Sequence, residues 1–148
     1  MCLIVFHWQP QSALPLQVWA NRDEFMARPA LATALWPEAS SVLVGRDVQG
    51  GSTWMGVTTQ GRFAALTNYR DPRITTAARS RGVLAAEYLR GNMSAATCAR
   101  QVQADRNLYG GFSLLLADAD ELWCVGSHQP EPVRVAPGWH GLSNAGLD

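Results

Sequence analysis

The sequence predicts an α+β fold in which antiparallel strands form sheets and the helices cover one face. Two observations lead to this expectation. Strand-like segments fill the first part of the chain and return at its end, and a pair of helix-like segments lies between them. No segment is repeated. With 148 residues, 47% of them apolar, the chain is long enough for one hydrophobic core. We therefore expect a single domain over residues 1–148.

The strands of the first half are predicted from apolar runs and from alternation. Leu3 to Phe6 is a short apolar run, typical of a strand buried on both faces. From Leu16 to Ala20, apolar residues alternate with Gln17 and Trp19, the period of a strand with one buried face. Three further strands are expected around the turn signals Gly50-Gly51 and Gln60-Gly61, at residues 42–44, 53–57 and 62–67.

Two helices are predicted after the Asp71-Pro72 break. Ser80 is the expected N-cap of the first helix, and Gly91 is its expected end. Ser94 is the expected N-cap of the second helix, which runs from Ala95 to Ala104. Strands are then expected at residues 112–117, 122–125, 133–135 and 141–143.

Composition and charge argue against several classes of function. Twelve basic residues balance twelve acidic residues, so the chain lacks the net positive field that attracts nucleic acids and anionic membranes. No apolar run approaches the ~18 residues of a membrane-spanning helix, and the N-terminus does not resemble a signal peptide. Three widely spaced cysteines suit a reducing compartment, so we expect a cytoplasmic protein. The three histidines show no metal-site spacing, and we expect neither a metal nor a cofactor.

Cys2 is the first candidate for chemistry. If aminopeptidase removes Met1, Cys2 becomes the N-terminus, and its α-amine lies beside its own thiol. Such an amine, with a reference pKa of ~7.7–8.0, can serve as the base for the thiol nucleophile. The alternative is a small apolar residue at a frayed chain end.

Four consecutive polar residues, Asn21, Arg22, Asp23 and Glu24, extend the second predicted strand. Alternation places Arg22 and Glu24 on one face and Asn21 and Asp23 on the other. A paired arginine can lower the pKa of a neighbouring thiol. The alternative is a solvated strand end.

These residues carry a family resemblance that extends over nearly the whole chain. The motifs are Met1-Cys2-Leu3-Ile4-Val5-Phe6, Asn21-Arg22-Asp23-Glu24-Phe25 with Arg28-Pro29, Gly45-Arg46-Asp47, Gly50-Gly51-Ser52-Thr53-Trp54, residues 61–70, Ser80-Arg81-Gly82, Tyr109-Gly110-Gly111-Phe112 and Gly141-Leu142-Ser143-Asn144-Ala145. Together they resemble the NRDE family, also called the transport and Golgi organisation family.

The resemblance implies a fold and a site. Members of the family are similar to N-terminal-nucleophile (Ntn) hydrolases of the bile-salt hydrolase and penicillin V acylase type, which form an αββα sandwich. The resemblance implies that Cys2 is the nucleophile and that Arg22 and Asp23 orient it, with Glu24 as the alternative acid and Asn21 left open. It also implies that Asn68 and Asn144 donate to the oxyanion of the tetrahedral intermediate, although both also suit strand-ending turns.

The implied function is cleavage of a non-peptide amide C–N bond in a small molecule. The alternative, from the same resemblance, is a haem or lipid carrier in trafficking. Because family members continue past the Leu-Ser-Asn-Ala segment, we expect the N-terminal part of such a sandwich, completed by a further segment or by a homo-oligomeric partner. Five arginines, at 62, 70, 73, 79 and 81, oppose only Asp71; they suit an acidic ligand, but a solvated loop is the main expectation.

Overall fold

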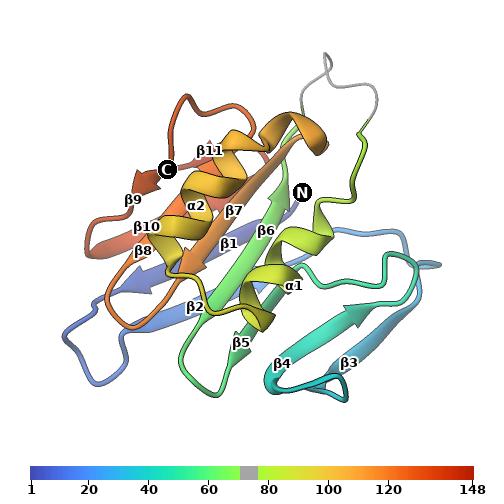
Figure 1. The fold of residues 1–148 in the computed structure, drawn as a ribbon, viewed down its shortest axis with the longest axis horizontal. Coiled ribbons are helices and arrows are strands. Elements are labelled where there is room, and N and C mark those ends of the chain that lie inside the picture. The colour runs from blue at the N-terminus through green and yellow to red at the C-terminus, as the bar shows by residue number, and fades with distance from the viewer. Residues whose placement is uncertain (71–76) are drawn as a thin grey trace.

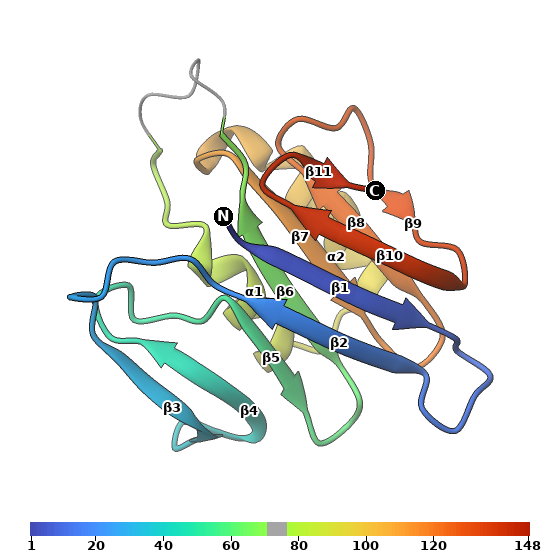
Figure 2. The same ribbon diagram turned by 180° about the vertical axis from the view of Figure 1, so that it is seen from behind.

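The computed structural model describes residues 1–70 and 77–148. Figure 1 and Figure 2 show three layers: a helical layer, a large sheet and a smaller sheet. The strands are β1 (Leu3–Trp8), β2 (Leu16–Asn21), β3 (Ala30–Trp36), β4 (Ala39–Asp47), β5 (Met55–Thr58), β6 (Phe63–Asn68), β7 (Phe112–Ala117), β8 (Leu122–Gly126), β9 (Val133–Arg134), β10 (Gly138–Ser143) and β11 (Gly146–Leu147). The helices are α1 (Gly82–Arg90), α2 (Ala95–Ala104) and a short 3₁₀ turn at Arg106–Leu108.

Both sheets are antiparallel in every described strand pair. The small sheet has the order β11-β10-β1-β2, and the large sheet runs from β3 to β9 in chain order. Helices α1 and α2 cover the outer face of the large sheet (Figure 1). The predicted α+β class is thus confirmed. Within residues 1–70 and 77–148 the layers are helix, sheet and sheet, without the second helical layer of an αββα sandwich.

Two apolar clusters hold the layers together. Between the helices and the large sheet, Leu84, Leu89 and Val102 pack on Leu114 and Leu116. A second cluster lies between the sheets and includes these residues: Ile4, Phe6, Trp8, Phe63, Leu115, Leu122 and Leu142. Every residue of β7, including the polar Ser113, is buried because the strand contributes to both clusters.

The first strand is buried on one face only, so the predicted burial on both faces is wrong. Ile4, Phe6 and Trp8 are buried against the large sheet, whereas the side chains between them face outward. In β2, Trp19 faces outward, is 52% exposed and stacks on Trp139 at 5.6 Å between ring centroids. The ring of Trp19 is therefore partly covered by Trp139, which belongs to the same sheet, and not by another layer of the fold.

The first helix differs from the sequence-based expectation. Helix α1 begins at Gly82 with Arg81 at the N-cap and no side-chain cap, so the predicted Ser80 cap is wrong. A Cβ at Gly82 would clash with the Ser52 hydroxyl, which shows how closely the helix start approaches the loop before β5. Tertiary packing, rather than a local cap, therefore decides where α1 begins. Its predicted end at Gly91 and the Ser94 cap of α2 are both confirmed.

Strands β3 and β11 were not predicted. Ala30–Trp36 carries three alanines and exposes six of its seven residues, so it shows little of the burial alternation that marks a strand. Pairing with β4 makes it a strand. Among the described helices, none is long and apolar enough to cross a membrane.

Candidate functional site

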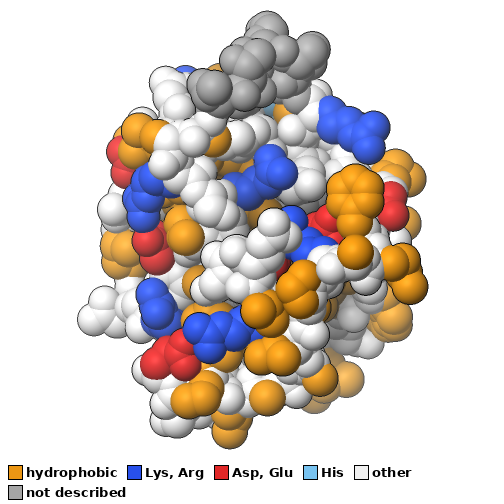
Figure 3. Space-filling model, turned by 90° about the vertical axis from the view of Figure 1, so that its right-hand side faces the viewer, with side chains coloured by type: hydrophobic (Ala, Val, Ile, Leu, Met, Phe, Trp, Pro, Cys, Tyr) orange, Lys and Arg blue, Asp and Glu red, His pale blue; other side chains and the backbone are white. Residues whose placement is uncertain are grey.

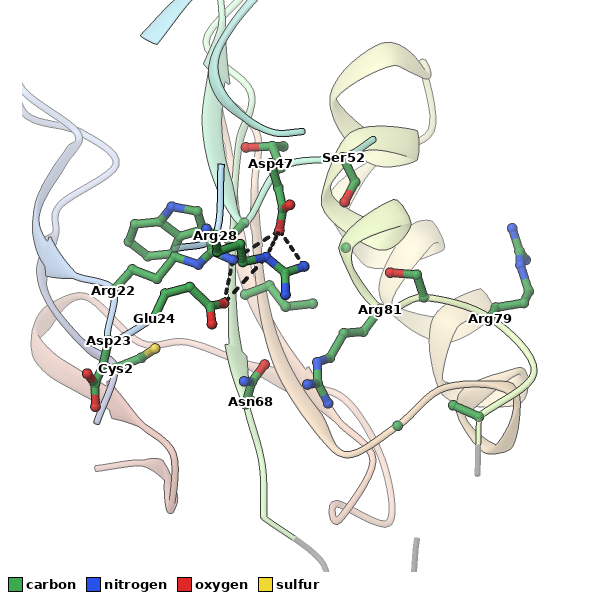
Figure 4. A pocket seen from close by; sticks show the side chains of 17 residues that line it. Cys2, Arg22, Asp23, Glu24, Arg28, Asp47, Ser52, Asn68, Arg79 and Arg81 are labelled. Atoms are coloured by element: carbon green, nitrogen blue, oxygen red, sulfur yellow. Dashed lines mark hydrogen bonds and ion pairs between the residues drawn. The ribbon is translucent and has the colours of Figure 1, made fainter. Parts of the chain in front are cut away.

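Cys2 lies immediately before β1, where pairing with β2 and β10 holds the strand on both sides. Its side chain is 6% exposed and lines a cavity of about 290 Å³. Figure 4 shows the sulfur directed into this cavity. The backbone N–H of Cys2 donates to Asn144 Oδ1 at 2.8 Å. The backbone of Cys2 is thus fixed by a hydrogen bond, and its thiol is buried at the cavity wall.

The chain terminus is held by the end of β2. The ammonium group of Met1 forms an ion pair with Asp23, and Asn21 Nδ2 donates to the Met1 carbonyl at 3.3 Å. The hydrogen bond and charge of this ammonium hold the pKa of Asp23 below its ordinary value. These two side chains lie on the same side of the extended segment, as alternation predicts.

Asn68 and Asn144 come from different sheets and meet at the site. Asn68 ends β6 in the large sheet, and Asn144 follows β10 in the small sheet. Asn144 Nδ2 donates to the Asn68 carbonyl at 2.6 Å. The Asn68 side chain faces the cavity that Cys2 lines (Figure 4). The two asparagines selected from the sequence, separated by 76 positions, are therefore brought together with Cys2.

An ion-pair network forms one wall of the cavity. Arg22 Nη2 lies 2.8 Å from Glu24 Oε2 and 3.0 Å from Asp47 Oδ2. Arg28 Nη2 lies 2.8 Å from the same Asp47 oxygen, and its Nε lies 3.7 Å from Glu24. Burial favours the neutral form of Asp47, but hydrogen bonds from Arg28, the Gly50 amide and Arg22 outweigh it and leave its pKa lowered. Acidic and basic side chains lie together near the middle of the face in Figure 3.

This network separates two acids that the sequence left as alternatives. Asp23 contacts the chain terminus, whereas Glu24 contacts Arg22 and Arg28. Arg22 and Asp23 point to different partners, so the structure does not join them as a pair. Asp23, rather than Glu24, is the carboxylate beside the chain end that carries Cys2.

Three residues at the site were not assigned from the sequence. Arg28 and Asp47 belong to motifs of the family resemblance, but nothing local shows that they would meet across 19 positions. Arg81 was grouped with the arginines of an expected solvated loop. That expectation is wrong for Arg81 and Arg62, which are both half-buried; Arg62 lies over the Tyr88 ring at 3.9 Å.

Within the described residues, no three His, Cys, Asp or Glu side chains are grouped so that they could hold a metal ion. His7 stacks on Trp139, and His128 stacks on Tyr69 with ring centroids 3.9 Å apart. His140 bonds to Asp148 at 2.8 Å. The histidines are therefore engaged at three separate places.

A second cavity, of about 600 Å³, lies at the other end of β2. Most of its lining is apolar, from Trp8, Leu16, Val18, Met55 and Phe63 among others. Its lining comes from the start of β2 in the small sheet and from β4 and β5 in the large sheet. Its apolar lining contrasts with the charged lining of the Cys2 cavity.

The family model and the curated relatives that match this chain give the same family. The model of the family described as Transport and Golgi organisation 2 matches residues 1–148. Curated relatives include the Transport and Golgi organization protein 2 homologs of Bos taurus, 42% identical over 161 residues, and of Homo sapiens, 36% identical over 161 residues. The alignments cover 100% of this chain, which spans 58% of the length of each of these relatives. Among solved structures, penicillin V acylase from Agrobacterium tumefaciens matches with a TM-score of 0.45 and 15% identity, over 93% of this chain and 41% of the acylase.

Proposed function

This chain belongs to the Transport and Golgi organisation 2 family, and from that premise and the site geometry we propose that it carries the nucleophile of a cysteine hydrolase of the Ntn type. The bond it would cleave is a non-peptide amide C–N bond in a small molecule. The observation that supports this most is the position of Cys2, between Asp23 and Asn144, with its thiol on a cavity.

The proposed active form requires removal of Met1. Cys2 N already lies 2.8 Å from Asn144 Oδ1, which would accept a hydrogen bond from the liberated α-amine. Asp23 binds the present terminal ammonium and would bind the new one after the chain is shortened by one residue. In its neutral form the α-amine is the base that takes the thiol proton, and Asp23 stabilises the ammonium that results.

The reaction has two balanced halves. The Cys2 sulfur attacks the amide carbonyl carbon while the thiol proton moves to the α-amine. The C–N bond then breaks, and that proton leaves with the amine product. Water attacks the resulting thioester, which releases the carboxylic acid and restores the thiol. In both halves negative charge develops on the carbonyl oxygen, where one oriented donor contributes about 3 kcal/mol of transition-state stabilisation.

The asparagines have distinct roles in this proposal. Asn144 uses Oδ1 for Cys2 N and one Nδ2 hydrogen for the Asn68 carbonyl, which leaves one hydrogen for the oxyanion. Asn68 presents its own amide to the cavity as the second donor (Figure 4). Arg22 acts through its ion pairs with Glu24 and Asp47, which hold the segment that carries Asp23.

The first measurement is the intact mass of the purified protein, which shows whether one Met residue has been lost. The second is hydrolysis of a panel of N-acyl amides by the wild type, by Cys2→Ser and by the control Cys98→Ser. Cys98 and Cys124 are buried, and burial raises the pKa of their thiols to about 11 and about 12. We expect Met1 to be absent, and turnover to disappear only in Cys2→Ser. Folded protein that retains Met1 throughout contradicts the mechanism.

The second candidate function is carriage of haem or a lipid in trafficking. The apolar cavity of about 600 Å³ favours it, because apolar ligands bind in such cavities. Among the described residues that line this cavity, Met55 is the one whose side chain carries a sulfur or an imidazole that could coordinate haem iron. If Met1 is retained and no amide is cleaved, haem titration decides this alternative: carriage gives a Soret band that shifts on Met55→Leu. The predicted cytoplasmic location fits either function and remains a prediction.

A further inference from the structure

Arg81 stands out among the arginines of the Cys2 cavity because its charge has no acidic partner in the part of the chain that the structure describes. Arg22 and Arg28 pair with Asp47 and Glu24, and Arg79 pairs with Glu87 at 2.7 Å. Arg81 instead makes one hydrogen bond to a described residue, from Nη1 to the Gly111 carbonyl at 3.0 Å. The side chain is half-buried, and burial lowers its pKa.

Arg81 lies where two neighbouring cavities meet. It lines both the cavity of about 290 Å³ and a neighbouring one of about 470 Å³. Cys2, Asp23 and Asn68 line the same two cavities. In Figure 4 the Arg81 side chain extends from the start of α1 toward the space beside Asn68. A ligand that reaches the Cys2 thiol would therefore meet this cation.

Glycines hold the guanidinium in one place. A Cβ at Gly110 would lie 3.1 Å from Arg81 Nη1, so the side chain packs directly on the glycine backbone. With Nη1 bound to Gly111, the Nε and Nη2 hydrogens remain for a ligand. Two parallel N–H groups of this kind match the two oxygens of a carboxylate.

We propose that Arg81 binds a carboxylate group of the ligand that occupies the Cys2 cavity. This rests on the proposed function only in naming the ligand as the substrate; binding of an anion beside Cys2 does not require turnover. The substrate class it implies is an acyl amide that carries a free carboxylate.

Two alkylating reagents that differ in charge test the proposal without any catalytic step. Iodoacetate and iodoacetamide both form a sulfur–carbon bond with the Cys2 thiolate and release iodide, but only iodoacetate carries a carboxylate. The measured quantity is the ratio of the two rate constants at Cys2, read by peptide mass and compared with the ratio for free cysteine. Cys2→Ser confirms the labelled position.

We expect the wild-type ratio to exceed that of free cysteine by about tenfold. Arg81→Gln should return it to the free-cysteine value and leave the iodoacetamide rate within about twofold, whereas Arg81→Lys should retain part of the preference. Arg79→Gln is the matched control: it removes the same charge from the same cavity lining, but from an arginine that Glu87 already neutralises. It should keep most of the preference.

Three results would overturn the proposal: a wild-type ratio equal to that of free cysteine, an equal loss for Arg79→Gln and Arg81→Gln, or an equal slowing of both reagents by Arg81→Gln. The last would mean that Arg81 only supports the local structure. The raised ratio at Cys2, found in a protein without amide hydrolysis, would contradict the proposed function and leave carboxylate binding intact. Amide hydrolysis by a protein whose Cys2 ratio equals that of free cysteine would support the proposed function and contradict carboxylate binding by Arg81.

Discussion

Asp47 is the residue on which the charged wall of the Cys2 cavity depends. Its carboxylate accepts from Arg22, Arg28 and the Gly50 amide, and its side chain is 9% exposed. Removing its charge leaves two half-buried guanidinium groups with one fewer acid between them, and a broken buried ion pair costs more than an intact one contributes.

We predict that Asp47→Asn lowers the free energy of unfolding by about 2 kcal/mol, measured by urea denaturation at pH 7. Glu38→Gln is the control, because Glu38 pairs with Arg46 at 2.9 Å on the surface, where an ion pair contributes about 0.5 kcal/mol or less. Equal losses in the two variants would show that Asp47 is no more than a surface partner.

The same residue predicts a pH dependence. The pKa of Asp47 is lower in the folded protein than in the unfolded chain, so its contribution is fully present above the unfolded value of ~3.9. It is lost as the pH falls through the folded pKa. The wild type should therefore lose stability more steeply than Asp47→Asn as the pH falls below about 4.

Helix α2 has a local start signal, and helix α1 does not. Ser94 Oγ accepts from the Thr97 amide at 3.2 Å, whereas α1 has no side-chain cap. We predict that Ser94→Ala lowers the free energy of unfolding by about 1 kcal/mol, measured by thermal or urea denaturation. The control is Ser80→Ala at the start of α1, which should change it by less than about 0.5 kcal/mol. A larger effect at Ser80 would mean that α1 has a cap in solution after all.

The two sheets meet at the Cys2 end of the molecule through polar contacts as well as through the apolar cluster. Thr67 Oγ1 in β6 donates to the Ser143 carbonyl in β10 at 3.1 Å, and Asn144 bonds to Asn68 one residue further along each segment. Thr67 is 1% exposed, so little water can replace its hydrogen bond. This junction fixes the distance between the sheet that carries Asn68 and the sheet that carries Cys2.

We predict that Thr67→Val, which keeps the shape of the side chain, lowers the free energy of unfolding by about 1–2 kcal/mol. It should also raise hydrogen exchange at the amides of residues 142–144, because the junction opens more often. Thr33→Val, on the exposed strand β3, is the control and should do neither. Unchanged exchange in Thr67→Val would show that the apolar cluster alone joins the sheets.

Local pattern accounts for much of the fold. The apolar runs of β1 and β7 and the Ser94 cap of α2 each predict their element, because strand formation and helix capping depend on neighbours a few residues apart. Strand β3 could not be predicted in this way. Its alanines have low strand propensity, and pairing with β4 decides its conformation.

For the site, the sequence by itself determined that Cys2, the 21–24 cluster, Asn68 and Asn144 were the residues to consider. It also indicated that alternate positions in that cluster face opposite ways. Only the tertiary structure decided that Asp23 reaches the chain terminus while Glu24 turns to Arg22, and that Asp47 and Arg81 belong to the same cavity. The reason is physical: a strand's alternation depends on adjacent residues, whereas the partner of a charge depends on segments that only the packing of two sheets and a helix brings together.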